Sequence, residues 1–322
     1  MPSTVQGETA SSTDTMTAPP AGDRPPAIPR WRRSLRPYLL TVPAVALIIG
    51  ILYPFVVGVL YAFQNYSSQN ENSVSWVGVK NFGQILNPAS TFFIGPAAWI
   101  TVQYAVLATV LETVLGVGVA LLLNRSSIIG RIFEKVLIMP LMIAPAIAAL
   151  AWKFMFNADF GVLNYLLGRS GFDWLSDTRA LYSAVLVDVW IYTPFVAILV
   201  LAGIRSLPKE PFEASAVDDA GGLYMFRRLM LPLIWPYILV AVIFRFMDCL
   251  KIFDIPYILT GGGPGTATTT LQISAFKDTF NSGAYSRAAT YMLILWAIVF
   301  IAARFLVGAL GKAQRRAAGA EN

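Results

Sequence analysis

Long apolar stretches alternate with short polar ones along this chain, and the lengths of the apolar stretches give the first prediction. A helix needs roughly 20 residues to cross about 30 Å of hydrocarbon at 1.5 Å per residue. Six stretches reach this length, so the sequence predicts an all-α integral membrane protein with six transmembrane helices. The predicted spans are Tyr38–Phe63, Pro96–Leu123, Ile132–Phe156, Leu181–Ile204, Leu233–Ile258 and Arg287–Leu310.

The two ends of the chain do not follow this pattern. Residues 1–29 are rich in Ser, Thr, Pro, Ala and Gly and have no hydrophobic period. Such a segment cannot bury enough surface to offset the entropy of ordering it. Arginines follow immediately before the first span. We therefore expect residues 1–35 to form a disordered basic cytoplasmic tail, residues 36–312 the transmembrane domain, and residues 313–322 a second cytoplasmic tail.

Composition supports the membrane assignment and excludes several functions. The chain is 56% hydrophobic and 13% charged, against about 45–50% and about 25% in soluble domains. Its net charge of +6 gives little support to nucleic-acid binding, because the basic residues can be assigned to the flanks of the spans. Histidine is absent and Cys249 is the single cysteine. Since these are the commonest metal ligands and nucleophiles, we expect no catalytic residue, metal or cofactor.

The positions of Lys and Arg predict the orientation in the membrane. With the N-terminus inside, most of the 24 basic residues fall in inner segments. Cytoplasmic loops of membrane proteins carry such an excess of Lys and Arg. We therefore expect a multi-pass protein of the cell (inner) membrane with both termini in the cytoplasm.

Residues 205–232, the polar segment, are too polar to cross a bilayer although apolar runs lie on both sides. A proline fits the first turn of a helix, where the missing N–H has no intrahelical partner, so we predict a short helix from about Pro211. Glu213 then lies near the positive end of the helix dipole, and Gly221 and Gly222 can end the helix. Small side chains in this helix would let another surface approach closely. The pattern predicts a cytoplasmic docking element.

The polar segment resembles the EAA loop of ABC importer permeases. The family pattern is Glu-Ala-Ala, two residues on Asp-Gly-Ala, and then Phe and Pro further along. Ser215 stands at the second Ala, and Asp219 stands where the family usually has Gly. The resemblance implies that this loop couples the permease to an ATPase. The coupling residues that it implies are Glu213, Ala214, Ser215, Asp218, Ala220, Gly221, Phe226 and Pro232.

A second resemblance lies at Phe253 and Asp254, followed by TGGGPG from Thr260 to Gly265, which is similar to an element of the sugar branch of these permeases. Its glycines permit a tight outer turn. The resemblance covers about residues 35–312 and implies an ABC type I importer bundle that carries carbohydrate, as maltose, trehalose or glycerol-phosphate systems do. It also implies partners: a second, usually different permease, two ATP-binding subunits and an extracytoplasmic solute-binding protein. ATP hydrolysis is expected on those separate subunits, since neither Walker motif is present.

Ionisable side chains inside spans are the other candidate site residues, because each costs about 2.5–3.5 kcal/mol on insertion scales. Glu112 can lie on the bundle-facing stripe of the second span. Asp188 precedes Pro194, which is expected to break the fourth span and to free backbone carbonyls that, with the carboxylate, can bind hydroxyls. A simple ion pair with a neighbouring helix is an equally open role for Asp188.

The fifth span carries Arg245, Asp248, Lys251 and Asp254 at every third position, so neighbouring members can form ion pairs along one helix. A role in the substrate path is equally open. Aromatic side chains in the spans can stack on sugar rings. The candidate substrate path comprises Asp188, Trp190, Tyr192, Asp248, Asp254 and Glu112.

Three other functions remain open. An ion-coupled secondary transporter would also have buried charges, but its sequence is expected to show an internal repeat. An importer of glycerol phosphate rather than a neutral sugar would need an unpaired cation, such as Arg245 or Lys251. A structural anchor for a peripheral complex fits the polar segment but leaves Glu112 and Asp188 unexplained.

Overall fold

The structure is a computed structural model of the chain and divides it into two units, residues 1–55 and 56–322. The first unit contains most of α1 (Arg30–Ala62), whose stretch Thr41–Ala62 is apolar enough to span a membrane. The described residues are 30–124, 128–208, 210–217 and 221–317.

Helix α1 begins at Arg30, so residues 30–35, which the sequence analysis assigned to the N-terminal tail, are helical in the structure. The first residues of α1 include several Arg and a Leu, which are good helix formers. The prediction of a disordered tail for residues 1–29 lies outside the described residues.

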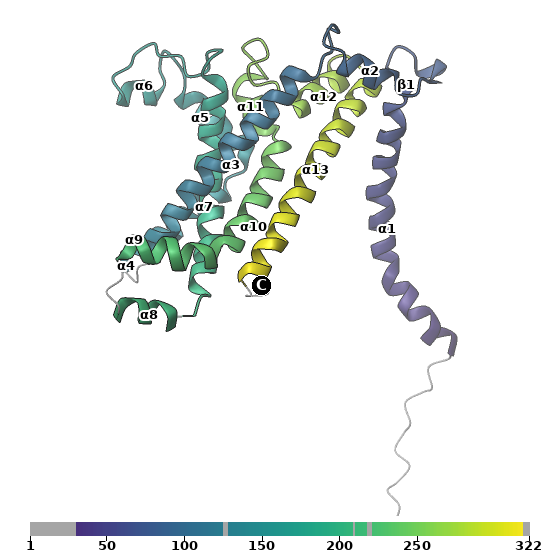
Figure 1. Cartoon of the computed structure of the whole chain (residues 1–322). Helices are drawn as coiled ribbons and strands as arrows, with labels where there is room; N and C mark the ends of the chain where they lie inside the picture. Colours follow the sequence, from purple (N-terminus) through teal and green to yellow (C-terminus); the bar gives the residue numbers. More distant parts are fainter. Residues whose placement is uncertain (1–29, 125–127, 209, 218–220, 318–322) are drawn as a thin grey trace, which may run out of the picture. The chain divides into compact units, whose positions relative to one another are not determined.

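The second unit is a bundle of long helices with short elements at its two ends (Figure 1). A small antiparallel hairpin pairs Gln64 with Trp76 and Asn65 with Ser75. After the end of α1, the second unit contains β1 (Gln64–Asn65), η1 (Glu71–Ser73), β2 (Ser75–Trp76), α2 (Lys80–Leu86), α3 (Gly95–Leu123), α4 (Ile128–Leu137), η2 (Pro140–Met142), α5 (Pro145–Met155), α6 (Val162–Leu166), α7 (Ala180–Arg205), α8 (Glu210–Val217), α9 (Gly222–Met225), η3 (Phe226–Met230), α10 (Leu231–Leu250), α11 (Asp254–Thr260), α12 (Leu271–Phe280) and α13 (Tyr285–Ala317).

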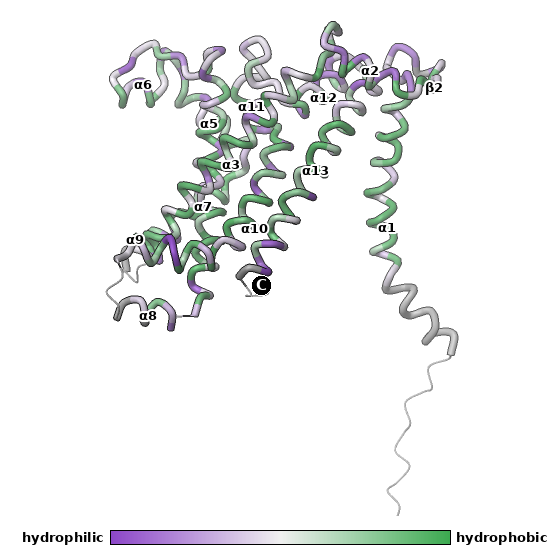
Figure 2. Tube along the Cα trace, viewed as in Figure 1, coloured by the Kyte–Doolittle hydropathy of each residue, from purple (hydrophilic) through white to green (hydrophobic). Residues whose placement is uncertain are grey.

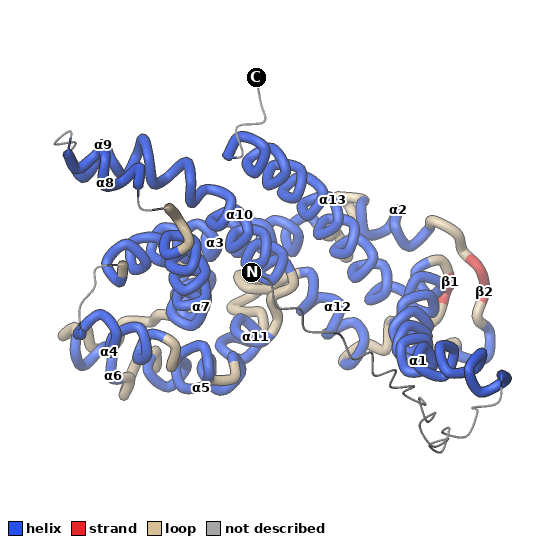
Figure 3. The backbone as a smooth tube through the Cα atoms, turned by 90° about the horizontal axis from the view of Figure 1, so that it is seen from below, coloured by secondary structure: helices blue, strands red, loops and turns tan. Residues whose placement is uncertain are grey.

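Helix α7 forms the centre of the bundle, where α3 and α10 pack against it, and α13 packs against α10 (Figure 3). In the most apolar 18-residue window of α7, 61% of the residues are buried, against 6% in the corresponding window of α13. Hydrophobic residues predominate along the long helices, and hydrophilic ones are more frequent at the helix ends and in the connecting segments (Figure 2). Small residues on α3 make the close packing possible. A Cβ added to Gly116 would come within 2.7 Å of the Val196 side chain on α7.

The described residues contain five single helices long and apolar enough to cross a membrane, and a sixth span if one bent pair of helices is counted. The second, fourth and sixth predicted spans correspond to α3, α7 and α13. The structure therefore confirms the predicted all-α membrane fold.

The predicted third span, Ile132–Phe156, is not one helix. The chain bends by 95° between residues 130–142 and Pro145–Met155. Two prolines explain the break: Pro140 begins η2 and Pro145 begins α5, and each lacks the N–H that would continue the preceding helix. Ala144 is extended with ψ 130°, as a residue before proline prefers.

The predicted fifth span, Leu233–Ile258, begins and ends later in the sequence than the helix in the structure. The apolar helix runs from Gly222 to Leu250, and Asp254 begins the separate helix α11. An acidic residue is favourable at a helix N-terminus, which explains why a new helix starts there.

Two smaller expectations have different outcomes. The predicted break at Pro194 is wrong, since α7 continues through this residue. Membrane helices tolerate an internal proline when neighbouring groups compensate for the lost hydrogen bond. The tight turn at Thr260–Gly265 is confirmed: Gly261 ends α11 with φ 65°, and a Cβ on Gly262 would come within 2.7 Å of Thr269 Oγ1.

We expect Gly116→Leu to destabilise the bundle, because the added side chain must displace α7. Overpacking of this kind typically costs about 1–3 kcal/mol. The matched control is Gly118→Leu on the same helix, where nothing lies within 4 Å of an added Cβ. The measurement is the thermal unfolding midpoint of the full chain in detergent, and equal midpoints for the two variants would contradict the prediction.

Candidate functional site

Buried charged side chains from three helices meet inside the bundle, and we call this group the charge cluster. It comprises Glu112 of α3, Asp188 of α7, and Arg245, Asp248 and Cys249 of α10. Glu112 and Asp188 are completely buried. The expectation that Glu112 lies on the bundle-facing stripe of its helix is confirmed. The packing of α3, α7 and α10 therefore brings these side chains together in the core.

Arg245 is the centre of the charge cluster. Its Nε and Nη2 donate to the two carboxylate oxygens of Glu112 at 2.6 and 2.9 Å. The same Nη2 donates to Asp188 Oδ2 at 3.1 Å, and Nη1 donates to Asp248 Oδ2 at 3.1 Å. The guanidinium also lies 3.7 Å from the centre of the Tyr192 ring. The planar guanidinium suits such bidentate pairing, so one residue joins three helices.

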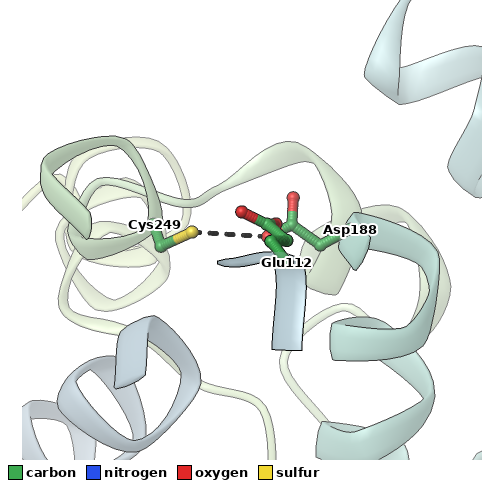
Figure 4. A group of neighbouring side chains, drawn as sticks. All are labelled: Glu112, Asp188 and Cys249. Atoms are coloured by element: carbon green, nitrogen blue, oxygen red, sulfur yellow. Dashed lines mark hydrogen bonds between the residues drawn. The ribbon is translucent and has the colours of Figure 1, made fainter. Parts of the chain in front are cut away.

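Glu112, Asp188 and Cys249 also carry possible metal ligands within 4.8 Å of one another. Figure 4 shows the three side chains converging, with Cys249 Sγ donating to Asp188 Oδ2 at 3.4 Å. The guanidinium of Arg245 occupies both oxygens of Glu112 and one of Asp188. A cation at this position would have to displace another cation, so the residues do not fit a metal site.

The candidate substrate path divides into buried and exposed residues. Glu112 and Asp188 are enclosed by the bundle and have no surface for a solute to contact. Tyr192 is half-buried and lies against Arg245. The Asp248 side chain is 58% exposed, so it is the member of the charge cluster that a solute can reach.

The other two predicted path residues lie apart from the charge cluster. Trp190 is 39% exposed and packs edge to face on Trp152, with ring centres 5.6 Å apart. It is two residues from Asp188 and therefore lies on the opposite side of α7. Asp254 is exposed in the first turn of α11.

The expected row of ion pairs along the fifth span is only partly present. Arg245 pairs with Asp248, and Lys251 lies 3.9 Å from Asp248. The row ends there because Lys251 terminates α10. Periodicity within one helix did not predict the partners of Arg245 on α3 and α7, nor the role of Cys249. The sequence did contain one signal for these partners. The second and fourth predicted spans each carry a lone acid, and the fifth carries a base, Arg245, that can pair with both.

The polar segment forms a short helix as predicted. Helix α8 begins at Glu210, next to the expected start at Pro211, and includes Glu213, Ala214 and Ser215. Glu213 is exposed, and Ser215 Oγ donates to the backbone carbonyl of Phe212 at 2.9 Å. The predicted coupling residues Asp218 and Ala220, together with Asp219, lie outside the described residues.

The two glycines after α8 have a different role from the one expected. Gly221 is the N-cap of α9, with φ −58° and ψ 143°, and Gly222 is the first residue of α9. They therefore begin the next helix rather than end α8 at a left-handed position. Phe226 begins the π turn η3, and Pro232 lies in the first turn of α10. The path from α9 into α10 is continuous helix because a proline is compatible with a first turn.

A cavity of about 550 Å³ lies beside α8. It joins the face of α8 to the end of α7 and to the helical stretch that enters α10. Nearby, Arg205 at the end of α7 pairs with Glu134 of α4 at 2.9 Å. The cavity is lined by Asn124, Ile204, Arg205, Leu207, Pro208, Phe212, Glu213, Met225 and Met230.

The sequence is similar to that of a family of transport proteins and to individual permeases. Residues 112–313 match the family described as binding-protein-dependent transport system inner membrane component. A probable ABC transporter permease protein, y4oQ of Sinorhizobium fredii, is 38% identical over 74% of this chain and 78% of its own length. The trehalose/maltose transport system permease protein MalF of Thermococcus litoralis is 30% identical over 84% of this chain and 92% of its own length.

The fold has a counterpart among solved structures. It resembles a chain of a bacterial ABC transporter involved in the import of the acidic polysaccharide alginate, with a TM-score of 0.74 and 20% identity. The match covers 88% of this chain and 99% of that one. Together with the family match over more than half of the sequence, this identifies the chain as a member of the binding-protein-dependent transport system inner membrane components, the permease subunits of ABC importers.

Proposed function

We propose that this permease imports a sugar or sugar-like solute that an extracytoplasmic binding protein delivers, and that it is driven by separate ATP-hydrolysing subunits docked on α8. The observation that carries the coupling role is the position of α8, which lies beyond one end of the long helices (Figure 1). Its first turn holds two acids, Glu210 and Glu213, and both are exposed. This arrangement supports docking of a partner protein on α8.

The connectivity of α8 supports a mechanism for coupling. The chain enters α8 from α7 and leaves it through α9 toward α10. Helices α7 and α10 carry Asp188 and Arg245 of the charge cluster. When ATP binding draws the two ATPase subunits together, a displacement of α8 would act on both helices at once. The subunit would then have two conformations, in which the substrate path opens to different sides of the membrane, and the bound nucleotide would set the population of each.

We propose that the charge cluster keeps α3, α7 and α10 together during this movement. Breaking a buried ion pair leaves a charge without a partner, which costs several kcal/mol, so these helices are expected to move as one unit. The structural role that the sequence left open for Asp188 is thereby favoured over direct contact with the solute.

The exposed carboxylate of Asp248 and the ring of Tyr192 are the path residues that we assign to solute binding. Carboxylates accept hydrogen bonds from hydroxyls, and aromatic faces pack on the apolar faces of sugar rings. Arg245 already pairs with three carboxylates, and Lys251 lies near Asp248, so a phosphate group would not find the unpaired cation at Arg245 that it requires. This favours a neutral sugar over glycerol phosphate.

The remaining parts of the proposal concern the assembly and its orientation. The α8 end of the bundle carries basic residues of η3 and of the last turns of α13, which supports a cytoplasmic location for this end. The excess of Lys and Arg in the predicted inner segments of the sequence supports the same location for both termini, in the inner membrane. A second, different permease would complete the path. Membership of the importer family favours this assembly over an ion-coupled transporter that works without an ATPase.

We expect Glu213→Ala to uncouple transport without preventing membrane insertion. A lost coupling free energy of about 1–3 kcal/mol would reduce uptake roughly 5- to 150-fold. Asp177→Ala, which removes an exposed acid from the loop before α7 rather than from α8, is the control and should keep nearly normal uptake. The measurement is solute uptake at equal abundance in the membrane. Normal uptake by the Glu213 variant would count against coupling through this residue.

Removing one buried partner of Arg245 should destabilise the bundle strongly. We expect Glu112→Gln to cost about 3–5 kcal/mol, because it leaves Arg245 without its bidentate acceptor. Asp248→Asn is the control, since this carboxylate contacts the same guanidinium but is exposed. The unfolding midpoints of the two variants should differ clearly in thermal denaturation of the full chain. If both variants unfold at the wild-type temperature, the charge cluster does not hold α3, α7 and α10 together.

Asp248→Asn should instead affect the solute. We expect it to raise the KM for uptake of the neutral sugar, because an amide accepts fewer hydrogen bonds than a carboxylate. Wild-type protein should take up a neutral disaccharide and not glycerol 3-phosphate in the same assay. Preferential uptake of the phosphorylated compound, lost in Lys251→Gln, would show that the phosphate importer was the correct alternative.

A further inference from the structure

A groove lies between α10 and α13. Its volume is about 480 Å³. It lies where α10 begins and α13 ends, at the same end of the bundle as α8 (Figure 1). The groove is lined by Pro232, Leu233, Trp235, Leu239, Ala309, Lys312 and Ala313.

The charges around this α10–α13 groove have one sign. Lys312 lines it, and Arg315 follows one turn later on α13; both side chains are exposed. The sequence has no Asp or Glu between residues 285 and 317, and none between residues 221 and 247. In the ion pairs of the described residues Lys312 takes no part. The groove is therefore an apolar slot with an uncompensated positive rim.

An exposed apolar track continues from the rim along α13. Ile301, Phe305, Gly308 and Lys312 follow one another at helical spacing and therefore lie on one face. Ile301 and Phe305 are among the most exposed apolar side chains of the chain, and nothing lies within 4 Å of a Cβ added to Gly308. The length of this track suits an acyl chain that runs from a headgroup toward the middle of the bilayer.

The side of the groove formed by α10 has interfacial character. Trp235 is 46% exposed and lines the groove close to the start of α10. Tryptophan is enriched where the membrane meets water, because its ring is apolar and its N–H can donate a hydrogen bond. Ala309 and Ala313 leave space opposite it. The groove thus combines a cationic rim, an indole at interfacial depth and an apolar track below.

We propose that the α10–α13 groove binds one anionic phospholipid, with its phosphate between Lys312 and Arg315, its glycerol region against Trp235, and an acyl chain along Phe305 and Ile301. Charge complementarity selects an anionic headgroup over a zwitterionic one, because basic pockets between membrane helices favour lipids with a net negative charge. This site is independent of the proposed transport function, since it requires only that the chain lie in a bilayer.

The test is native mass spectrometry of the full chain in mild detergent, with dioleoylphosphatidylglycerol or dioleoylphosphatidylcholine added. We expect the wild type to retain one phosphatidylglycerol and to lose phosphatidylcholine. The double variant Lys312→Gln/Arg315→Gln should weaken phosphatidylglycerol binding about tenfold or more, since each cation near the headgroup contributes. The matched control is Arg227→Gln/Arg228→Gln, which removes two exposed cations from the same end of the bundle but not from this groove.

A second variant tests the shape of the groove. Ala309→Phe should fill it and abolish retention of the lipid while the cations stay, provided that size-exclusion chromatography shows a monodisperse protein. Equal retention of the two lipids, or an equal loss in the two double variants, would overturn the proposal. It would also be overturned if the isolated chain retained the lipid but the chain purified with its transport partners did not, because a partner would then cover the groove.

Discussion

The contact between Arg245 and the carboxylate of Glu112 is the interaction on which the bundle depends. Both groups are buried, so neither can exchange its partner for water. Asp188 adds a second buried carboxylate from α7. A buried cation without these acceptors would be very unfavourable, and the same is true of the acids without the cation. The packing of α3, α7 and α10 is therefore constrained by charge as well as by apolar surface.

In the proposed mechanism, the same constraint links the docking helix α8 to the helix bundle. The polar segment interrupts the chain between α7 and α10, and these helices are joined again inside the membrane by Asp188 and Arg245. In that mechanism, a displacement of α8 would act on two helices that are paired with each other rather than on two independent ones.

Sequence length and hydropathy were sufficient to predict α3, α7, α13 and the helix α8, because each depends on local composition and on proline or capping residues. The bend before Pro145 and the early end of α10 were missed, since apolar content alone does not show where a helix stops inside an apolar run. The partners of Arg245 could not be predicted either. They depend on which faces of three helices meet, and that information is not local in sequence.

The broken third span has a further consequence for the subunit. Helix α5 has 11 residues, about 16 Å at 1.5 Å per residue, which is roughly half the thickness of the hydrocarbon core. In a bilayer, where lipid offers no hydrogen bonds, the turn between the two helices needs partners for its backbone, and Met139, Leu141, Met142 and Ile143 each donate to a carbonyl three residues earlier. Non-helical backbone is tolerated there only beside protein or a water-filled space. The turn therefore supplies its hydrogen bonds from within the chain, and the bent span can lie in a bilayer despite its break.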